Sequence, residues 1–269
     1  NPKLTRYLLD QYLADADFEK ACEVLSKNLK PLENNYLSKF NIYCLIKTGR
    51  KEEAQLIYDL KKELGFKDKY FEKKINFLLG YTNEVDKSIS EKSIFDFFLA
   101  HRTNSEFSFQ PNENTSRLVW KYLSSSNLLP DLTNIDINEE DKISIIEKAT
   151  HYKIYSEKEL FKHYKKFQFN INQLLDVEES IKSLSPIQSR ALVYQRTLLT
   201  KEPNLKLKFA ILLKELFQKD EIDLAFDLEL INILSEIKID NISDNLLTFY
   251  NNFSKKEDND FKRINFNNK

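Results

Sequence analysis

The feature that most restricts the fold of this chain is its shortage of glycine. Only three glycines, Gly49, Gly65 and Gly80, occur among 269 residues. Phosphate-binding loops and the Gly-x-Ser-x-Gly turn of serine hydrolases need closely spaced glycines, and these three are too far apart. Tight β-hairpins favour Asn-Gly or Asp-Gly, and the chain has neither dipeptide. The sequence therefore excludes these motifs and favours helices over a β-rich fold.

Residues 7–64 contain two similar segments 33 positions apart. In each, an apolar helix ends in a short turn, and a second helix starts a few residues before an alanine, Ala21 in the first segment and Ala54 in the second. The apolar spacing predicts two helical hairpins. The expected helices span residues 4–14, 18–30, 35–48 and 51–64.

These hairpins resemble tetratricopeptide repeats, which have a 34-residue period with small or aromatic residues at set positions. The departures are Thr5 and Leu9, which stand where the repeat has tryptophan and glycine, and Pro31, which is displaced by one position. The wider layout also resembles a group of bacterial helical-repeat proteins to which we attach no activity. The positions that match are Tyr12, Phe18 and Ala21 in the first repeat, and Leu45, Gly49 and Ala54 in the second.

The resemblance implies a concave groove, lined by the first helix of each hairpin, that holds an extended or helical peptide. Transferred by position, the partner-binding residues are Arg6 and Asp10 in the first repeat and Lys39, Tyr43 and Lys47 in the second. Arg6 and Lys39 would bind a carboxylate, and Tyr43 would pack on an apolar side chain.

After residue 66 the strict period is lost, but helical patterns continue. Ser156 with Glu159 and Ser185 with Gln188 have the spacing of capping boxes. Short connections predict antiparallel neighbours. The expected helices span residues 70–80, 90–100, 116–124, 139–151, 157–168, 172–183, 186–201, 204–219, 222–238 and 242–254.

We therefore expect an all-α fold, a right-handed α-solenoid of stacked antiparallel helical hairpins. Residues 1–65 would form the two tetratricopeptide-like hairpins, and residues 66–137 irregular helices with loops. Residues 138–253 would form degenerate hairpins continuous with the first array, and residues 254–269 a polar tail.

Two carboxylate–histidine pairs are the strongest candidates for metal chemistry. Glu147 with His151 and Glu159 with His163 are each four residues apart. The spacing matches neither the Glu-x-x-His of di-iron bundles nor the His-Glu-x-x-His of zinc proteases. Pairs with this spacing are common on exposed helix faces. We therefore expect solvated side chains here, and no metal or cofactor.

The helix predicted at 157–168 mixes lysines with aromatic residues, a combination that can bind nucleic acid. Its apolar residues, Leu160, Phe161, Tyr164 and Phe167, fall on one stripe, which predicts a core face with the lysines in solvent. The chain has 41 basic and 42 acidic residues, so it has no general attraction for nucleic acid. Acidic clusters at 136–141 and 257–260 lack the EF-hand pattern, and helix capping and tail solvation account for them.

The two cysteines, Cys22 and Cys44, are too few for a disulfide framework or a structural zinc site. We expect buried thiols rather than a disulfide. No apolar run approaches the ~20 residues that span a bilayer, and no signal peptide is visible. The chain begins Asn1-Pro2 and contains no methionine, which indicates a processed or excised piece. It is expected to be soluble, in the cytoplasm or periplasm, and its oligomeric state is open.

The sequence predicts a non-enzymatic helical-repeat scaffold that binds a protein or peptide through its concave face. The alternative is a helical accessory segment of a larger enzyme or envelope-associated machine, with catalysis elsewhere. A helical enzyme in its own right is the third hypothesis. An accessory segment should show an exposed apolar face where its neighbour docks, whereas an enzyme needs a buried cluster of acids or histidines.

Overall fold

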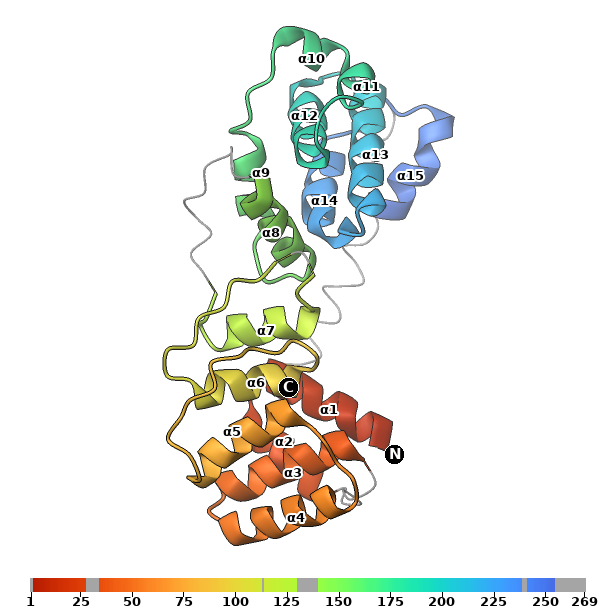
Figure 1. The fold of residues 1–269 in the computed structure, drawn as a ribbon. Helices are drawn as coiled ribbons and strands as arrows, with labels where there is room; N and C mark the ends of the chain where they lie inside the picture. The colour runs from red at the N-terminus through yellow and green to blue at the C-terminus, as the bar shows by residue number, and fades with distance from the viewer. Residues whose placement is uncertain (1, 28–33, 113, 130–139, 239–240, 255–269) are drawn as a thin grey trace. The chain divides into compact units, whose positions relative to one another are not determined.

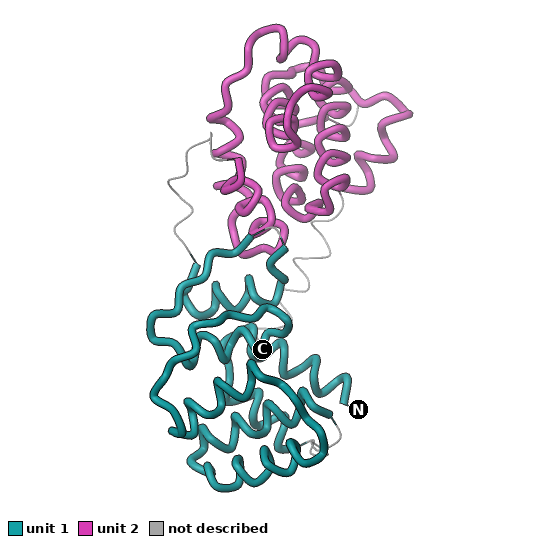
Figure 2. The backbone as a smooth tube through the Cα atoms, viewed as in Figure 1, with its two compact units in different colours: residues 1–130 teal, residues 131–269 magenta. Residues whose placement is uncertain are grey.

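The computed structural model describes residues 2–27, 34–112, 114–129, 140–238 and 241–254. Within these ranges every regular element is a helix, which confirms the all-α prediction (Figure 1). The chain divides into two compact units, Asn1–Pro130 (unit 1) and Asp131–Lys269 (unit 2), as Figure 2 shows. The right-handed solenoid and its continuity through residues 138–253 stay predictions. Residues 255–269, which make up nearly all of the predicted polar tail, lie outside the described ranges.

Unit 1 contains the two predicted hairpins. Helix α1 packs against α2, and α3 packs against α4. Helix α1 also packs against α6 and α7, and α5 packs against α3 and α6, so the later helices share one core with the hairpins. The helices span Pro2–Ala14 (α1), Phe18–Lys27 (α2), Asn35–Lys47 (α3), Lys51–Glu63 (α4), Lys69–Leu79 (α5), Ile94–Thr103 (α6) and Arg117–Ser125 (α7).

The two hairpins turn in the same way. Ala16 and Gly49, which are 33 positions apart, both have left-handed backbone conformations, with φ of 57° and 81°. Ala21 and Ala54, also 33 positions apart, are both fully buried. Such turns close a helix through a hydrogen bond from the residue after the left-handed one. These bonds join Asp17 N to Tyr12 O (2.9 Å) and Arg50 N to Leu45 O (2.8 Å).

The variants Gly49→Ala and Ala16→Gly should change the stability of unit 1 in opposite directions. We expect Gly49→Ala to lower the free energy of unfolding by about 1 kcal/mol, because a left-handed conformation costs alanine about 1–2 kcal/mol. A Cβ at Gly49 would meet no atom within 4 Å, so the cost is conformational. Ala16→Gly should raise it by about 0.5 kcal/mol, because the entropy cost of ordering glycine offsets part of the relief.

Denaturant unfolding followed by the fluorescence of Trp120 measures both changes. Trp120, on α7 of unit 1, is fully buried and is the sole tryptophan of the chain. Shifts of the same sign for the two variants would contradict the equivalence of the turns.

The core of unit 1 is rich in aromatic rings contributed mainly by α3 and α6. Phe95 of α6 lies 4.9 Å from Phe40, and Phe98 lies 5.3 Å from Tyr43, measured between ring centroids. Phe18 of α2 completes the group with an edge-on contact to Tyr43 at 5.2 Å. Such tilted and edge-to-face pairs add to the stability gained from apolar burial. Helix α6 is therefore as central to this core as the two hairpins are.

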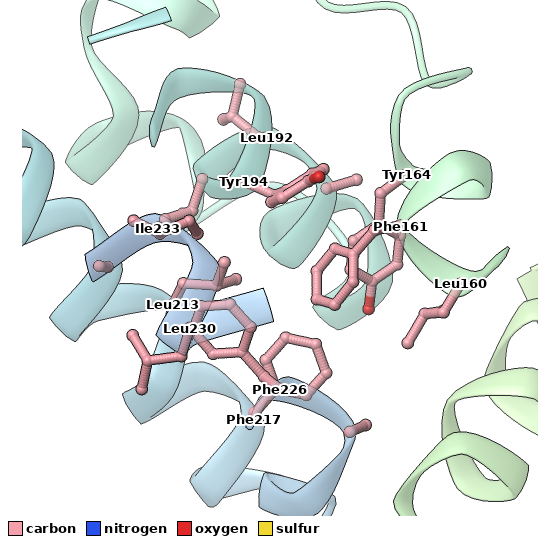
Figure 3. Packing of buried hydrophobic residues seen from close by; sticks show 14 of the residues in the cluster. Leu160, Phe161, Tyr164, Leu192, Tyr194, Leu213, Phe217, Phe226, Leu230 and Ile233 are labelled. Carbon is pink, nitrogen blue, oxygen red and sulfur yellow. The ribbon is translucent and has the colours of Figure 1, made fainter. Parts of the chain in front are cut away.

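Unit 2 is built around the antiparallel pair α12 and α13, and α8, α9, α14 and α15 pack on them. Figure 3 shows its core, where Phe161 of α9 meets Tyr194 of α12, with Phe217 and Phe226 close by. The helices span Glu140–His151 (α8), Glu157–Tyr164 (α9), Ile171–Leu175 (α10), Val177–Ser180 (α11), Pro186–Leu199 (α12), Pro203–Lys219 (α13), Asp223–Phe226 (the 3₁₀ helix η2), Leu228–Ser235 (α14) and Asp244–Ser254 (α15).

Two predicted helices of unit 2 are each divided in the structure. The helix expected at 172–183 is α10 followed by α11, because Asp176 leaves the helical conformation and caps α11 by accepting a bond from Glu179 N. The helix expected at 222–238 is η2 followed by α14. The spacing of apolar residues does not show where a side chain caps a helix, so it predicts one helix where the structure has two.

The two predicted capping boxes also differ from expectation. The Ser156 side chain makes no capping hydrogen bond, so that prediction is wrong. Ser185 does cap α12, since its hydroxyl accepts from Gln188 N at 3.2 Å. The Gln188 side chain donates instead to Glu140, at 2.6 Å, so only half of that box forms.

Candidate interaction site

Of the five predicted groove residues, Arg6 and Lys47 are exposed and Asp10 is partly buried. The exposed guanidinium of Arg6 stacks on the Tyr36 ring, 4.4 Å from its centroid, and lies 3.7 Å from the Asp10 carboxylate. Asp10 also accepts a hydrogen bond from the Tyr36 hydroxyl. Burial raises the pKa of Asp10, and the Tyr36 hydrogen bond and the charge of Arg6 oppose that shift. Lys47 is exposed, with its ammonium 5.7 Å from the Tyr43 centroid.

The other two groove residues are buried, so the roles assigned to them do not fit. Lys39 is 7 % exposed, and its ammonium lies 2.7 Å from Asp96 and 3.0 Å from Asp68. Its charge is already paired and cannot serve a partner's carboxylate. Tyr43 is 1 % exposed and belongs to the aromatic core. The face of α3 that a tetratricopeptide groove would expose is covered here by α5 and α6.

The carboxylate–histidine pairs of unit 2 do not all lie in solvent, as the sequence led us to expect. Glu147 is 2 % exposed and His163 is 3 % exposed, so the prediction is wrong for these two. His151 accepts from Leu224 N at 3.3 Å, and Glu159 pairs with Lys162. The described residues contain no group of three or more potential ligands placed to hold a metal ion.

Glu147 belongs to a buried ionic cluster that the sequence analysis missed. Arg190 of α12 grips its carboxylate with two hydrogen bonds, 2.9 Å to Oε1 and 2.6 Å to Oε2. The Tyr164 hydroxyl donates to the same carboxylate, and Arg190 also pairs with Asp220. Burial raises the pKa of Glu147, and the charge of Arg190 opposes this. Each polar atom of the Glu147 carboxylate is satisfied internally, so the cluster joins helices α8, α9 and α12.

Buried lysines elsewhere also hold the protein's own backbone. Lys74 donates to the carbonyl oxygens of Asp86 and Ser88, the latter at 3.0 Å. Lys214 donates to Asp223 O at 2.9 Å and to the Asp227 carboxylate at 3.0 Å. An ammonium can be buried when such acceptors replace water. These lysines therefore fix irregular segments against helices rather than offering charge to a ligand.

The lysines of α9 and its C-terminal end behave as the sequence predicted. Leu160, Phe161 and Tyr164 are buried, and Phe167 packs against the same core. The basic residues Lys158, Lys162, Lys165 and Lys166 are exposed on the other side. The aromatic rings are therefore committed to the core and cannot stack on bases.

Cys22 and Cys44 form a disulfide that joins α2 to α3, with 5.8 Å between their Cα atoms. The expectation of two thiols is therefore wrong. Both residues lie on the inner faces of consecutive hairpins, and the packing of the hairpins brings them together. Their separation along the chain, 22 residues, carries no sign of this pairing in the sequence.

The clearest candidate contact surface is an exposed leucine stripe that runs along α4 to its C-cap residue, Leu64. Leu56, Leu60 and Leu64 are 69 %, 41 % and 68 % exposed and recur every four residues. The opposite face of α4, with Ala54 and Tyr58, packs on α3. The sequence reasoning did not identify this stripe. The sequence does indicate such a stripe, because this helix has apolar residues on two sides and a single neighbouring helix covers only one of them.

Comparison with protein-family models, curated proteins and solved structures finds no match to the chain. Among the helices that the structure describes, none is long and apolar enough to cross a membrane. The proposal of a function therefore depends on the geometry of the surfaces described above.

Proposed function

We propose that the protein is a non-enzymatic helical scaffold that binds a protein partner, and that α4 makes the main contact. The observation that carries the proposal is the stripe formed by Leu56, Leu60 and Leu64. Scattered exposed leucines are ordinary, but a row along one helix is a typical protein-binding feature. The buried charged groups described above, such as Lys39 and Glu147, are paired within the protein, so they supply fold stability and not a reaction centre.

The contact proposed here differs from the groove that the repeat resemblance implies. With Lys39 and Tyr43 in the core, only Arg6 and Lys47 of the predicted set are exposed, and Asp10 is partly buried. These three can contribute to a second contact, but their charged groups already have partners or lie on a ring. Helix α4, the second helix of the second hairpin, is therefore a better candidate for the contact surface than the first helix of either hairpin.

A helical accessory segment of a larger, envelope-associated machine is the second candidate function. Its supporting observation is the Cys22–Cys44 disulfide. Disulfides persist in oxidising compartments such as the periplasm and are rare in the cytosol. The pairing therefore supports a setting outside the cytoplasm, where the leucine stripe would dock on another component of the assembly.

Removing the leucine stripe should abolish partner binding without unfolding the protein. The variant Leu56→Ser with Leu64→Ser changes two side chains that are more than two-thirds exposed, so its stability should stay within about 0.5 kcal/mol of the native protein per substitution. The immobilised native chain is expected to retain a specific protein from an extract of the source cells, and this variant to lose it.

The matched control for this experiment is Leu175→Ser in unit 2. Leu175 has the same exposure as Leu56, 69 %, but lies on α10. The control should retain the protein that the native chain retains. Retention of the same proteins by all three forms, or of none by the native chain, would contradict the proposal.

A further inference from the structure

The leucine stripe of α4 is bordered by a row of acidic side chains. Glu52, Asp59 and Glu63 are exposed. Residues three or four apart are neighbours on a helix surface, so Glu52 and Asp59 flank Leu56, and Glu63 flanks Leu60. All three acids fall on the same side of the stripe.

Among the residues that the structure describes, none forms an ion pair with Glu52, Asp59 or Glu63. The ion pairs that the structure shows on α4 involve other residues, Glu53 with Arg50 and Lys62 with Glu72. Asp59 accepts one neutral hydrogen bond, from the Gln55 amide at 2.8 Å. The surface of α4 therefore has an apolar stripe with a row of three negatively charged side chains beside it.

We infer that α4 binds an amphipathic helix of a protein partner, one with an apolar stripe flanked by lysine or arginine. This inference rests on the proposed function and specifies the partner's chemistry. Leu56 and Leu64 are eight residues apart, about 12 Å along the helix axis, so the stripe matches two turns of a partner helix. The partner's apolar ridge would pack beside the leucines, and its basic residues would lie over Glu52, Asp59 and Glu63, as flanking charges do in coiled coils.

The charges disfavour the other occupants of such a surface. A second copy of this chain would bring a second acidic row to the interface, and in a symmetric pairing like charges across an interface oppose association. A membrane surface that carries anionic lipids would be repelled in the same way. A basic helix is the one apolar occupant whose association the acidic row favours.

Synthetic peptides test the inference directly on the 269-residue chain. The first is an 18-residue amphipathic helix with a leucine stripe flanked by lysines, the second has glutamates in place of the lysines, and the third is a scrambled form of the first without a stripe. The lysine-flanked peptide should bind at least tenfold more tightly than either other peptide. Because surface charges are screened by salt, its affinity should fall between 20 and 500 mM NaCl.

The variant Glu52→Gln with Asp59→Asn and Glu63→Gln isolates the charges. Exposed charge pairs contribute a few tenths of a kcal/mol to about 1 kcal/mol each, so this triple variant should bind the lysine-flanked peptide about tenfold more weakly. It should also lose most of the preference over the glutamate-flanked peptide. The control Glu178→Gln with Glu179→Gln, in the exposed acidic turn of α11, should leave both affinities unchanged.

Several results would overturn the inference. These are equal binding of the scrambled peptide, unchanged affinity in the triple acidic variant, self-association of the native chain that the leucine variant abolishes, or binding to vesicles of phosphatidylserine. Failure of the inference is separable from failure of the proposed function. If a retained protein depends on Leu56 and Leu64 but not on Glu52, Asp59 and Glu63, the function stands and the basic-helix inference falls.

Discussion

The variant Arg190→Met is expected to lower the free energy of unfolding of unit 2 by about 3–5 kcal/mol, the usual cost of removing one partner from a buried ion pair. Arg190 supplies two of the three hydrogen bonds that hold the Glu147 carboxylate, and the Arg190 and Glu147 side chains are each about 3 % exposed. Methionine fills a similar volume but leaves Glu147 buried with only the Tyr164 hydroxyl as a donor. The loss therefore comes mainly from an uncompensated charge rather than from lost packing.

Two further variants separate charge from packing. Replacing both partners, with Glu147→Leu and Arg190→Met, should recover most of the lost stability, because apolar residues of similar size often substitute for a buried pair at little cost. Lys182→Met removes one partner of an exposed pair with Glu179, and should change stability by less than about 1 kcal/mol. Denaturant unfolding followed by circular dichroism measures all three. A loss for Arg190→Met no larger than that for Lys182→Met would show that the cluster does not stabilise unit 2.

The pH dependence of the Arg190→Met penalty provides a second readout. Burial raises the pKa of Glu147 even in the native protein, and losing Arg190 removes the charge that opposes this rise. When the pKa of a carboxyl is higher in the folded protein than its unfolded value of about 4.3, ionisation of that carboxyl destabilises the fold. The penalty should therefore be largest above the folded pKa of Glu147 in the variant. It should shrink by up to about 1.4 kcal/mol per pH unit as pH falls from that pKa to the lower folded pKa of Glu147 in the native protein. A penalty that is constant from pH 8 to pH 5 would contradict this mechanism.

The helices could be predicted from the sequence because each depends on local spacing. Apolar residues recur every three or four positions, and glycines follow the predicted ends of α3, α4 and α5, where the structure places left-handed residues. The position of Ala16 shows the same turn without glycine. Helix boundaries set by a single capping side chain, as at Asp176, could not be predicted in this way. Many polar residues can cap a helix, and the sequence does not show which of them does so in the folded protein.

The buried polar groups could not be predicted because they depend on contacts between distant residues. Glu147 and Arg190 are 43 positions apart, and Lys39 and Asp96 are 57 positions apart. A charged residue in a helix is most often exposed, so the spacing predicted that Glu147 lies in solvent. The repeat resemblance placed Lys39 in a groove. Each residue can be buried because a residue of opposite charge on another helix pairs with it. Which residues meet depends on how the helices pack.

The surface of α4 lies between these two cases. The apolar residues at positions 56, 60 and 64 are visible in the sequence, and their spacing by four shows that they share one side of the helix. Whether that side is covered depends on which helices pack on α4. In unit 1, α4 packs on α3 through its other side, which leaves the leucines exposed beside the acidic row.

Removal of the Cys22–Cys44 disulfide is expected to lower the free energy of unfolding of unit 1 by about 3 kcal/mol. The bond closes a loop across 22 positions, and cross-linking a loop of that length reduces the entropy of the unfolded chain by about this amount. Because the bond joins the two hairpins, the effect should appear in unit 1. Trp120 fluorescence should therefore report a lower unfolding midpoint for the variant Cys22→Ala with Cys44→Ala.

Chemical reduction should reproduce the effect of that variant. Cys44 is only 8 % exposed, so the reductant must act during unfolding and refolding rather than on the native protein. The native chain should then unfold at the same denaturant concentration as the double variant, whose own midpoint the reductant should leave unchanged. Alkylation of the unreduced chain in denaturant adds a further check, since a disulfide leaves no thiol to modify. Two alkylated cysteines in protein isolated from its natural source would contradict the pairing, and would remove the support for a setting outside the cytoplasm.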